Sequence, residues 1–253
     1  MEARRRSRAR GYDHYHFKAD GDGNQYFLNL AMMRGTSVAH GRPFVNVIQA
    51  VNWMNRWREP GPGEMRFLTY TTLAYGAQGI CHFVYNFKNV SSSFFDQKDG
   101  DRPLPRYWLC SRLNRDFIAI ATQLQPMRSL GAYHLGVIPM GARSLPADSR
   151  FTIDPAPPHQ PYGNPVLGLR NEEPINGLLL GCFGKADQTT RVLVVNLDYE
   201  RGLTTELVGP GPMESFHAPT GAWHPDRARG ARMKLNLPPG GGTLVRLAAE
   251  PEP

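Results

Sequence analysis

The segment VNVIQAVNWMNRW, residues 45–57, combines side chains that could bind a sugar. It begins as an apolar run of the kind that forms a β-strand, and it changes character at Gln49. The amide of Asn52 and the indoles of Trp53 and Trp57 follow. Amides both donate and accept hydrogen bonds, and flat aromatic faces pack against the C–H faces of pyranose rings. The pattern indicates a carbohydrate site, yet a hydrolase needs a carboxylate and this strand offers an amide.

The first half of the chain, residues 11–125, alternates strand-like and helix-like segments. Strands are expected where aromatic and β-branched residues cluster, and helices where apolar residues recur at helical spacing. Three strand–helix repeats predict parallel strands joined by right-handed crossovers. In the first helix, Phe27, Leu30, Ala31 and Val38 lie roughly on one face. The expected elements are strands at 12–17, 43–51 and 79–87 and helices at 24–40, 63–77 and 107–124.

The pattern changes near Gln125. Short apolar segments follow one another with turn-forming residues between them, and no helical stripe recurs. Such spacing predicts an antiparallel β-sandwich over residues 126–253. The strands expected in this half are 131–138, 177–184, 191–197, 203–208, 231–237 and 243–249.

Composition and charge narrow the class of protein. The chain has 253 residues, of which 41% are hydrophobic, enough for a substantial core. Its formal charge is +7, and five arginines lie in the first ten residues, so we expect residues 1–10 to form a disordered basic terminus. The rest of the chain lacks the alternation of basic and aromatic residues found in proteins that bind single-stranded nucleic acid. This argues against nucleic acid as a partner.

Targeting and cofactor motifs are lacking in the sequence. No apolar stretch follows the arginines and no run of eighteen apolar residues occurs, so neither a signal peptide nor a membrane span is expected. The cysteines Cys81, Cys110 and Cys182 lack C-x-x-C spacing. Neither a phosphate loop nor H-E-x-x-H occurs, so no cofactor and no metal is predicted.

Several segments resemble a glycoside hydrolase. YDHYHF, GRPFVNVIQAVNW and EMRFLTYTTLAYGAQGICHFVYNF are similar to the last three β/α units of the (β/α)₈ barrel in the clan that includes β-galactosidases and β-agarases. TRVLVVNLD, PTGAW and LNLPPGGGTLVRL resemble the small β-sandwich that often follows such barrels. The resemblance covers residues 11–248. It implies a partial (β/α)₈ barrel over 11–125, followed by a sandwich.

Such a barrel needs about 250 residues for its eight strands, and only three units fit here. The chain is therefore expected to be a C-terminal fragment, a sequence whose gene start is placed too late, or a reduced descendant; these alternatives stay open. An open half-barrel exposes a strand edge and the inward faces of its strands. We therefore expect self-association or a partner through this surface.

The resemblance also locates the chemistry, because active sites of such barrels lie at the carboxyl ends of the strands. In this clan the acid/base belongs to strand four, which is absent, and the nucleophile to strand seven, which here ends at Gln49. Neither role carries over. Asp13 and Glu64 are the candidates for catalytic carboxylates. The competing interpretations are a solvated loop residue for Asp13 and a first-turn helix carboxylate for Glu64.

The predicted ligand-binding groups are polar and aromatic residues near the same strand ends. Gln49 and Asn52 are expected to face the open end beside Trp53. The sequence thus predicts a carbohydrate-active protein, the C-terminal portion of a glycoside hydrolase that is incomplete or inactive by itself. The alternative is a non-catalytic carbohydrate-binding or structural module. The candidate binding residues are His14, Tyr15, Gln49, Asn52, Trp53, Tyr85 and Asn86.

Overall fold

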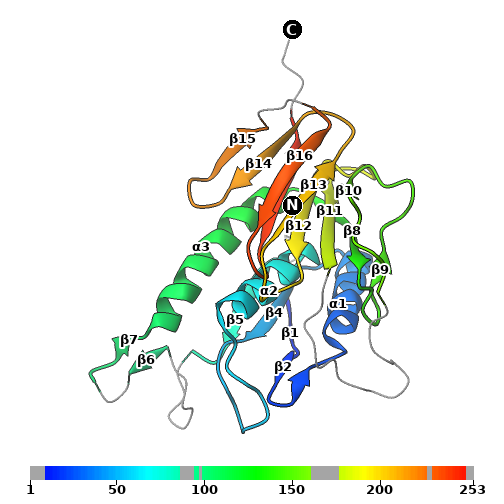
Figure 1. The fold of residues 1–253 in the computed structure, drawn as a ribbon. Coiled ribbons are helices and arrows are strands. Elements are labelled where there is room, and N and C mark those ends of the chain that lie inside the picture. Colours follow the sequence, from blue (N-terminus) through cyan, green and yellow to red (C-terminus); the bar gives the residue numbers. More distant parts are fainter. Residues whose placement is uncertain (1–8, 86–93, 97–98, 161–176, 227–229, 249–253) are drawn as a thin grey trace, which may run out of the picture.

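The computed structural model describes residues 9–85, 94–96, 99–160, 177–226 and 230–248. Asn86 and nearly all of the predicted basic terminus lie outside the described residues. Within the described part, the chain is a mixed α/β protein with three α-helices and a large multi-stranded sheet (Figure 1). No helix in that part is long and apolar enough to cross a membrane.

The first half of the chain forms a small parallel sheet with helices. The strands β1 (Arg10–Asp13), β4 (Phe44–Gln49) and β5 (Gly79–Phe83) pair in the order β1-β4-β5, and both pairings are parallel, as predicted. The helices are α1 (Tyr26–His40), α2 (Pro62–Ala74) and α3 (Pro105–Leu124). Two hairpins lie in the connections: β2 (Phe17–Lys18) with β3 (Gly21–Asp22), and β6 (Phe95–Asp96) with β7 (Arg102–Pro103).

Two expectations for this half are wrong in detail. The strand predicted at 12–17 ends at Asp13, because Phe17 pairs with Asp22 in the β2–β3 hairpin. Val38, expected on the same face of α1 as Phe27 and Leu30, is 48% exposed while those two are buried. It lines a cavity between α1 and α3, so helical spacing alone assigned it to the wrong environment.

The second half forms two further sheets. Their strands are β8 (Arg128–Gly136), β9 (Arg143–Ser144), β10 (Thr152–Asp154), β11 (Gly177–Gly184), β12 (Arg191–Asn196), β13 (Leu203–Val208), β14 (Met213–His217), β15 (Ala222–Pro225), β16 (Arg232–Leu237) and β17 (Gly242–Leu247). The larger sheet has the order β15-β14-β17-β12-β11-β8-β9, and the smaller has the order β10-β13-β16. Their pairings are antiparallel, apart from β8 with β9. The sequence pattern did not predict β9, β10, β14 or β15.

One apolar cluster lies between these two sheets. Leu178 and Val194 contribute from the larger sheet, and Leu207, Met233 and Leu235 from the smaller. All five side chains are buried. In β16 the exposed and buried residues alternate, as expected when one face of a sheet meets the core and the other meets water.

Helix α2 is buried on nearly all sides, because it lies between the parallel sheet and the larger antiparallel sheet (Figure 1). Met65 and every residue from Phe67 to Ala74 are buried. Gly181 of β11 permits the close approach: a Cβ there would lie 2.5 Å from the carbonyl oxygen of Ala74. The two halves of the chain thus share one core around α2.

The parallel sheet has one covered face and one open face. Asn46 points toward α2, where its amide donates to the Thr72 hydroxyl at 2.8 Å. Val45 and Val47 point the opposite way and are only partly buried. Gly11 and Cys81, their neighbours on β1 and β5, are exposed. Parallel sheets are normally covered on both faces, so this open face is unusual.

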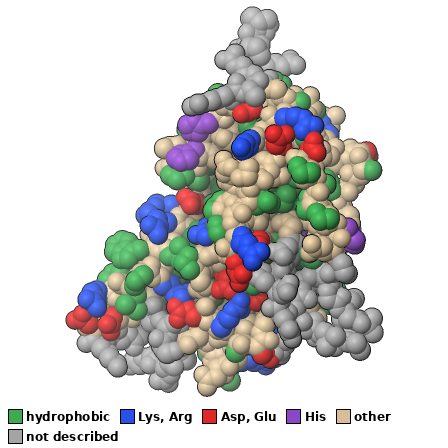
Figure 2. Space-filling view, viewed as in Figure 1, with side chains coloured by type: hydrophobic (Ala, Val, Ile, Leu, Met, Phe, Trp, Pro, Cys, Tyr) green, Lys and Arg blue, Asp and Glu red, His purple; other side chains and the backbone are tan. Residues whose placement is uncertain are grey.

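Charged groups of both signs are mixed over the visible surface, and apolar side chains gather along α3 (Figure 2). Trp108 and Ile118 of this helix are 57% and 64% exposed. Isolated exposed apolar residues are common in soluble proteins. These two residues lie at different positions around α3, and Ile118 lines the cavity between α1 and α3.

Candidate functional site

The predicted site lies where the three parallel strands end. Asp13, Gln49 and Phe83 are the last residues of β1, β4 and β5. The strand register pairs Asp13 with Val47 and Gln49 with Phe83, so these ends meet at one edge of the sheet. The residues that follow the three strands therefore start from the same end of the sheet.

Four rings, Tyr15, Trp53, Trp57 and Phe83, form an aromatic cluster at this edge. The two indoles stack with centroids 4.8 Å apart and planes 18° apart. Tyr15 lies 5.0 Å from Phe83, and Trp53 lies 5.2 Å from the same ring. Both tryptophans remain partly exposed. The cluster therefore offers flat apolar surface to a ligand, and it includes the predicted residues Tyr15 and Trp53.

A tight turn brings the two tryptophans together. Met54 and Asn55 both have φ of 52°, a left-handed conformation that few residues other than glycine adopt. Their backbones allow Trp53 and Trp57 to exchange two hydrogen bonds of 3.1 Å. Met54, at the tip of the turn, is 72% exposed. The geometry thus holds the indole pair at the surface.

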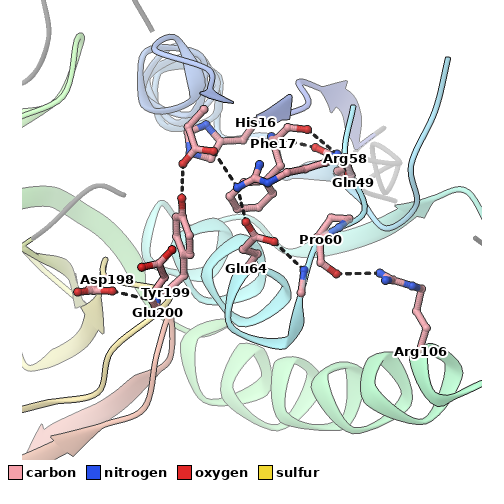
Figure 3. Close-up of polar contacts among 12 residues, drawn as sticks. His16, Phe17, Gln49, Arg58, Pro60, Glu64, Arg106, Asp198, Tyr199 and Glu200 are labelled. Carbon is pink, nitrogen blue, oxygen red and sulfur yellow. Dashed lines mark hydrogen bonds and ion pairs between the residues drawn. The ribbon is translucent and has the colours of Figure 1, made fainter. Parts of the chain in front are cut away.

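Gln49, predicted to bind a ligand at the open end of the strands, is instead buried and hydrogen-bonded to the backbone. It is 2% exposed, and its side-chain oxygen accepts a hydrogen bond from the Phe17 N–H at 3.0 Å. Its amide nitrogen donates to the carbonyl oxygens of Phe17 at 2.8 Å and Arg58 at 2.7 Å (Figure 3). Both amide hydrogens are therefore used. Gln49 fixes the backbone on either side of the aromatic cluster, because the β2–β3 hairpin lies over it.

Glu64 is also held by structural contacts. Its carboxylate accepts a hydrogen bond from the Gly61 N–H at 2.6 Å and pairs with the Arg58 guanidinium (Figure 3). Burial raises its pKa, and the Gly61 hydrogen bond and the Arg58 charge oppose that shift. The structure records no contact between Glu64 and Asp13. The first-turn helix role fits these contacts better than the predicted catalytic role.

Asp13, His14 and Tyr15 remain together at the strand edge. The Asp13 carboxylate is exposed and accepts a long hydrogen bond of 3.4 Å from the Tyr15 hydroxyl. His14 Nδ1 lies 3.4 Å from the Asn29 amide nitrogen, and its Nε2 has no recorded hydrogen bond. Burial lowers the pKa of His14, so the ring is neutral at pH 7. Asp13 is therefore an acceptor beside the aromatic cluster.

Tyr85 belongs to a different group of rings. It is 55% exposed and stacks on Phe94 at 5.4 Å, near the start of α3. The structure therefore does not bring this predicted residue into the aromatic cluster. Asn52 follows β4 and is partly buried. Asn86 lies outside the described residues.

A buried polar network beside the site was not predicted. Asp22 accepts a hydrogen bond of 2.5 Å from the Tyr199 hydroxyl and lies 3.0 Å from Arg58. His16 Nε2 lies 3.6 Å from the same carboxylate, and burial lowers the His16 pKa to about 4. Asp22 and Tyr199 are 177 residues apart in sequence, and no local signal links them. Through Asp22, Tyr199 of the second half holds the loop that ends at Arg58.

Arg106 of α3 anchors the other side of that loop. Its guanidinium donates to the carbonyl oxygens of Ala50 at 2.7 Å and Pro60 at 3.1 Å, and it pairs with Glu59. Figure 3 shows the contact with Pro60. Together with Gln49, it fixes the loop that carries both tryptophans. No group of three or more His, Cys, Asp and Glu residues in the described part of the chain is placed to hold a metal ion.

Comparisons with known proteins bear on this site. Residues 5–97 match the model of a glycoside hydrolase family, Glyco_hydro_42, described as beta-galactosidase. A solved rhamnosidase from Novosphingobium sp. PP1Y is similar with a TM-score of 0.54 and 10% identity, over 95% of this chain and 35% of that one. Residues 5–97 are thus related to a family of glycoside hydrolases. This relationship confirms the coarse part of the predicted resemblance.

The remaining comparisons add little. A second structure, described as a glycoside hydrolase, has a TM-score of 0.38 at 10% identity, over 88% of this chain and 47% of that one. No curated protein matches the chain. The family match covers less than half of the residues, and the chain spans about a third of the rhamnosidase. At such low identity the likeness to the rhamnosidase concerns the fold.

Proposed function

We propose that the chain is the sugar-binding, C-terminal portion of a glycoside hydrolase and does not cleave glycosidic bonds by itself. In this proposal, its three β/α units are part of a (β/α)₈ barrel, and the two antiparallel sheets that follow are a β-sandwich. The parallel order β1-β4-β5 and the relationship to glycoside hydrolases support it. The open face of the parallel sheet also fits, because the inner face of a barrel needs further strands to enclose it.

One observation carries the proposal: the aromatic cluster lies at the carboxyl ends of parallel strands, beside the exposed carboxylate of Asp13. Glycosidic hydrolysis normally uses two carboxyl groups, about 5–10 Å apart. Gln49 is an amide, and Glu64 is engaged by Arg58 and by the Gly61 N–H. Neither Gln49 nor Glu64 therefore offers Asp13 a free second carboxyl group of the kind that hydrolysis uses.

Each residue of the proposed site has a role in binding. Trp53 presents the ring face that is not stacked on Trp57 to the C–H face of a pyranose. Trp57 supports it from the other side, with the Arg56 guanidinium 5.0 Å from its own ring centroid. The Asp13 carboxylate accepts hydrogen bonds from sugar hydroxyls, and the Tyr15 hydroxyl orients that carboxylate. The neutral ring of His14 supports the site from below, because its Nε2 is buried and its Nδ1 faces the Asn29 amide. Asn52 is a further proposed contact, because it follows β4 and directly precedes Trp53 of the aromatic cluster.

Isothermal titration calorimetry with galactosides and rhamnosides tests the proposal, together with a hydrolysis assay on the 4-nitrophenyl derivatives. The wild type should bind a glycoside and show no turnover. Trp53→Ala should weaken binding at least tenfold, or about 1.4 kcal/mol. Trp108→Ala is the matched control, since Trp108 is exposed on α3 outside the cluster, and it should bind like the wild type.

Three results would contradict the proposal. Turnover by the wild-type chain would show that it has a complete catalytic pair. Equal weakening by Trp53→Ala and Trp108→Ala would place the ligand elsewhere. Lack of affinity for every glycoside tested would favour the alternative, a non-catalytic structural module, in which the aromatic cluster only packs under its loop.

A further inference from the structure

A second candidate site lies at the opposite edge of the parallel sheet. A cavity of about 620 Å³ opens beside Pro43 and Gln78, which precede β4 and β5. The aromatic cluster lies at the other ends of these strands. Six residues of extended β4 separate the two sites by on the order of 16 Å. The cavity has the size of known small-molecule sites, about 300–1,000 Å³.

The walls of the cavity come from both halves of the chain. The C-terminal parts of α1 and α3 form two sides, and the turn after α2 forms a third. Phe183 of β11 and Met127 lie on the side of the second half. Val38 and Ile118 are 48% and 64% exposed, so apolar surface remains open to a ligand here. The site therefore suits a ligand with an apolar body.

The charged groups of the lining have one sign. The described residues that line the cavity include Arg42 and Arg128 but no aspartate or glutamate. No ion pair is recorded for Arg42 among the described residues. Arg128 lies 3.6 Å from Asp187, but both side chains are strongly exposed, and such pairs are weak in water. The cavity thus retains two positive charges that a ligand could neutralise.

The ends of three helices also face this region, and their carbonyl groups carry partial negative charge, about half a unit per helix. Backbone N–H groups already bond many of these carbonyls. The bonds are Gly41 to Val38 at 3.4 Å, Gly76 to Leu73 at 2.8 Å and Met127 to Leu124 at 2.8 Å. The capped helix ends therefore do not cancel two full guanidinium charges.

We infer that this cavity binds a small organic anion with an apolar body, such as an aryl phosphate. The guanidinium groups of Arg42 and Arg128 bind the anionic group, because guanidinium forms charge-assisted hydrogen bonds with phosphate and carboxylate. Val38, Ile118 and Phe183 contact the apolar body. The site is independent of the proposed sugar site, so either can fail without the other.

Calorimetric titration with 1-naphthyl phosphate tests this inference, with 1-naphthol and inorganic phosphate as partial ligands. Naphthyl phosphate should bind one to one and at least tenfold more tightly than either partial ligand. The double variant Arg42→Gln/Arg128→Gln should weaken its binding about tenfold or more. Ile118→Asp, a change at an exposed position, should weaken it through charge repulsion without affecting folding.

Arg112→Gln is the matched control, because Arg112 is an exposed arginine of α3 that does not line the cavity. It should leave affinity unchanged. Lack of binding at millimolar naphthyl phosphate would overturn the inference. So would equal affinity in the wild type and the double variant, or 1-naphthol binding as tightly as naphthyl phosphate.

Discussion

Replacing Gln49 with leucine should destabilise the protein strongly. The change keeps the size of the side chain but removes its three hydrogen bonds. The Phe17 carbonyl would keep a partner, since it also accepts from the Arg58 N–H at 3.2 Å. The Phe17 N–H and the Arg58 carbonyl would lose theirs. At about 1–3 kcal/mol for each unsatisfied buried group, the loss is roughly 2–6 kcal/mol.

Urea denaturation followed by circular dichroism measures this loss. Gln125→Leu is the control, because Gln125 is exposed on the last turn of α3 and should change stability by less than about 0.5 kcal/mol. Equal midpoints for the wild type and Gln49→Leu, with unchanged slopes, would refute the structural role assigned to Gln49. A ligand-binding role would predict that result, because a ligand-facing amide contributes little to folding.

Gln49→Glu extends the same test. An ionised glutamate could accept from the Phe17 N–H, but it would face the carbonyls of Phe17 and Arg58 with no hydrogen to donate. Its pKa should therefore be raised in the folded protein. Relative to the wild type, the variant should be most stable below about pH 4 and lose stability as pH rises through the raised pKa. A difference in stability independent of pH would contradict this reasoning.

Two further predictions concern pH and association. Burial lowers the pKa of His16 to about 4 and of His134 to about 3, so the unfolded chain binds protons below pH 6.5 that the folded chain does not. The free energy of unfolding should therefore fall as pH decreases from 6.5 toward 4. His134→Gln should reduce the slope of that free energy against pH by about 1.4 kcal/mol per pH unit. An unchanged slope would show that His134 is not held neutral in the folded protein. The isolated chain should self-associate through the open sheet face, and Val47→Asp should shift sedimentation toward monomer; a wild type that stays monomeric at high concentration would contradict this.

The sequence predicted elements well where local pattern decides them. The bounds of β11 and β13 agree with the segments 177–184 and 203–208, because each apolar or alternating run is limited by turn residues. The face of β4 that carries Gln49 was also assigned correctly, opposite Asn46. Side-chain alternation along a strand needs no tertiary information.

The environment of those elements could not be predicted in the same way. Gln49 is buried because a hairpin that begins at Phe17 lies over it, and no spacing in the sequence reveals that contact. α2 is buried on nearly all sides because strands more than a hundred residues later pack on it. The bond between Asp22 and Tyr199 has the same origin. Long-range packing thus decided which polar residues are structural and which remain available to a ligand.

The shared burial of α2 limits how this architecture can be recombined. Its side chains Phe67 and Leu73 belong to the same apolar cluster as Leu179 and Leu193 of the antiparallel sheet. A cut near residue 125 would expose both surfaces at once, so neither piece would keep a closed core. Chimeras that exchange the second half between related chains must therefore match the surface of α2 as well as the junction. In this protein the boundary between the halves runs through a helix-packing surface and not through a linker.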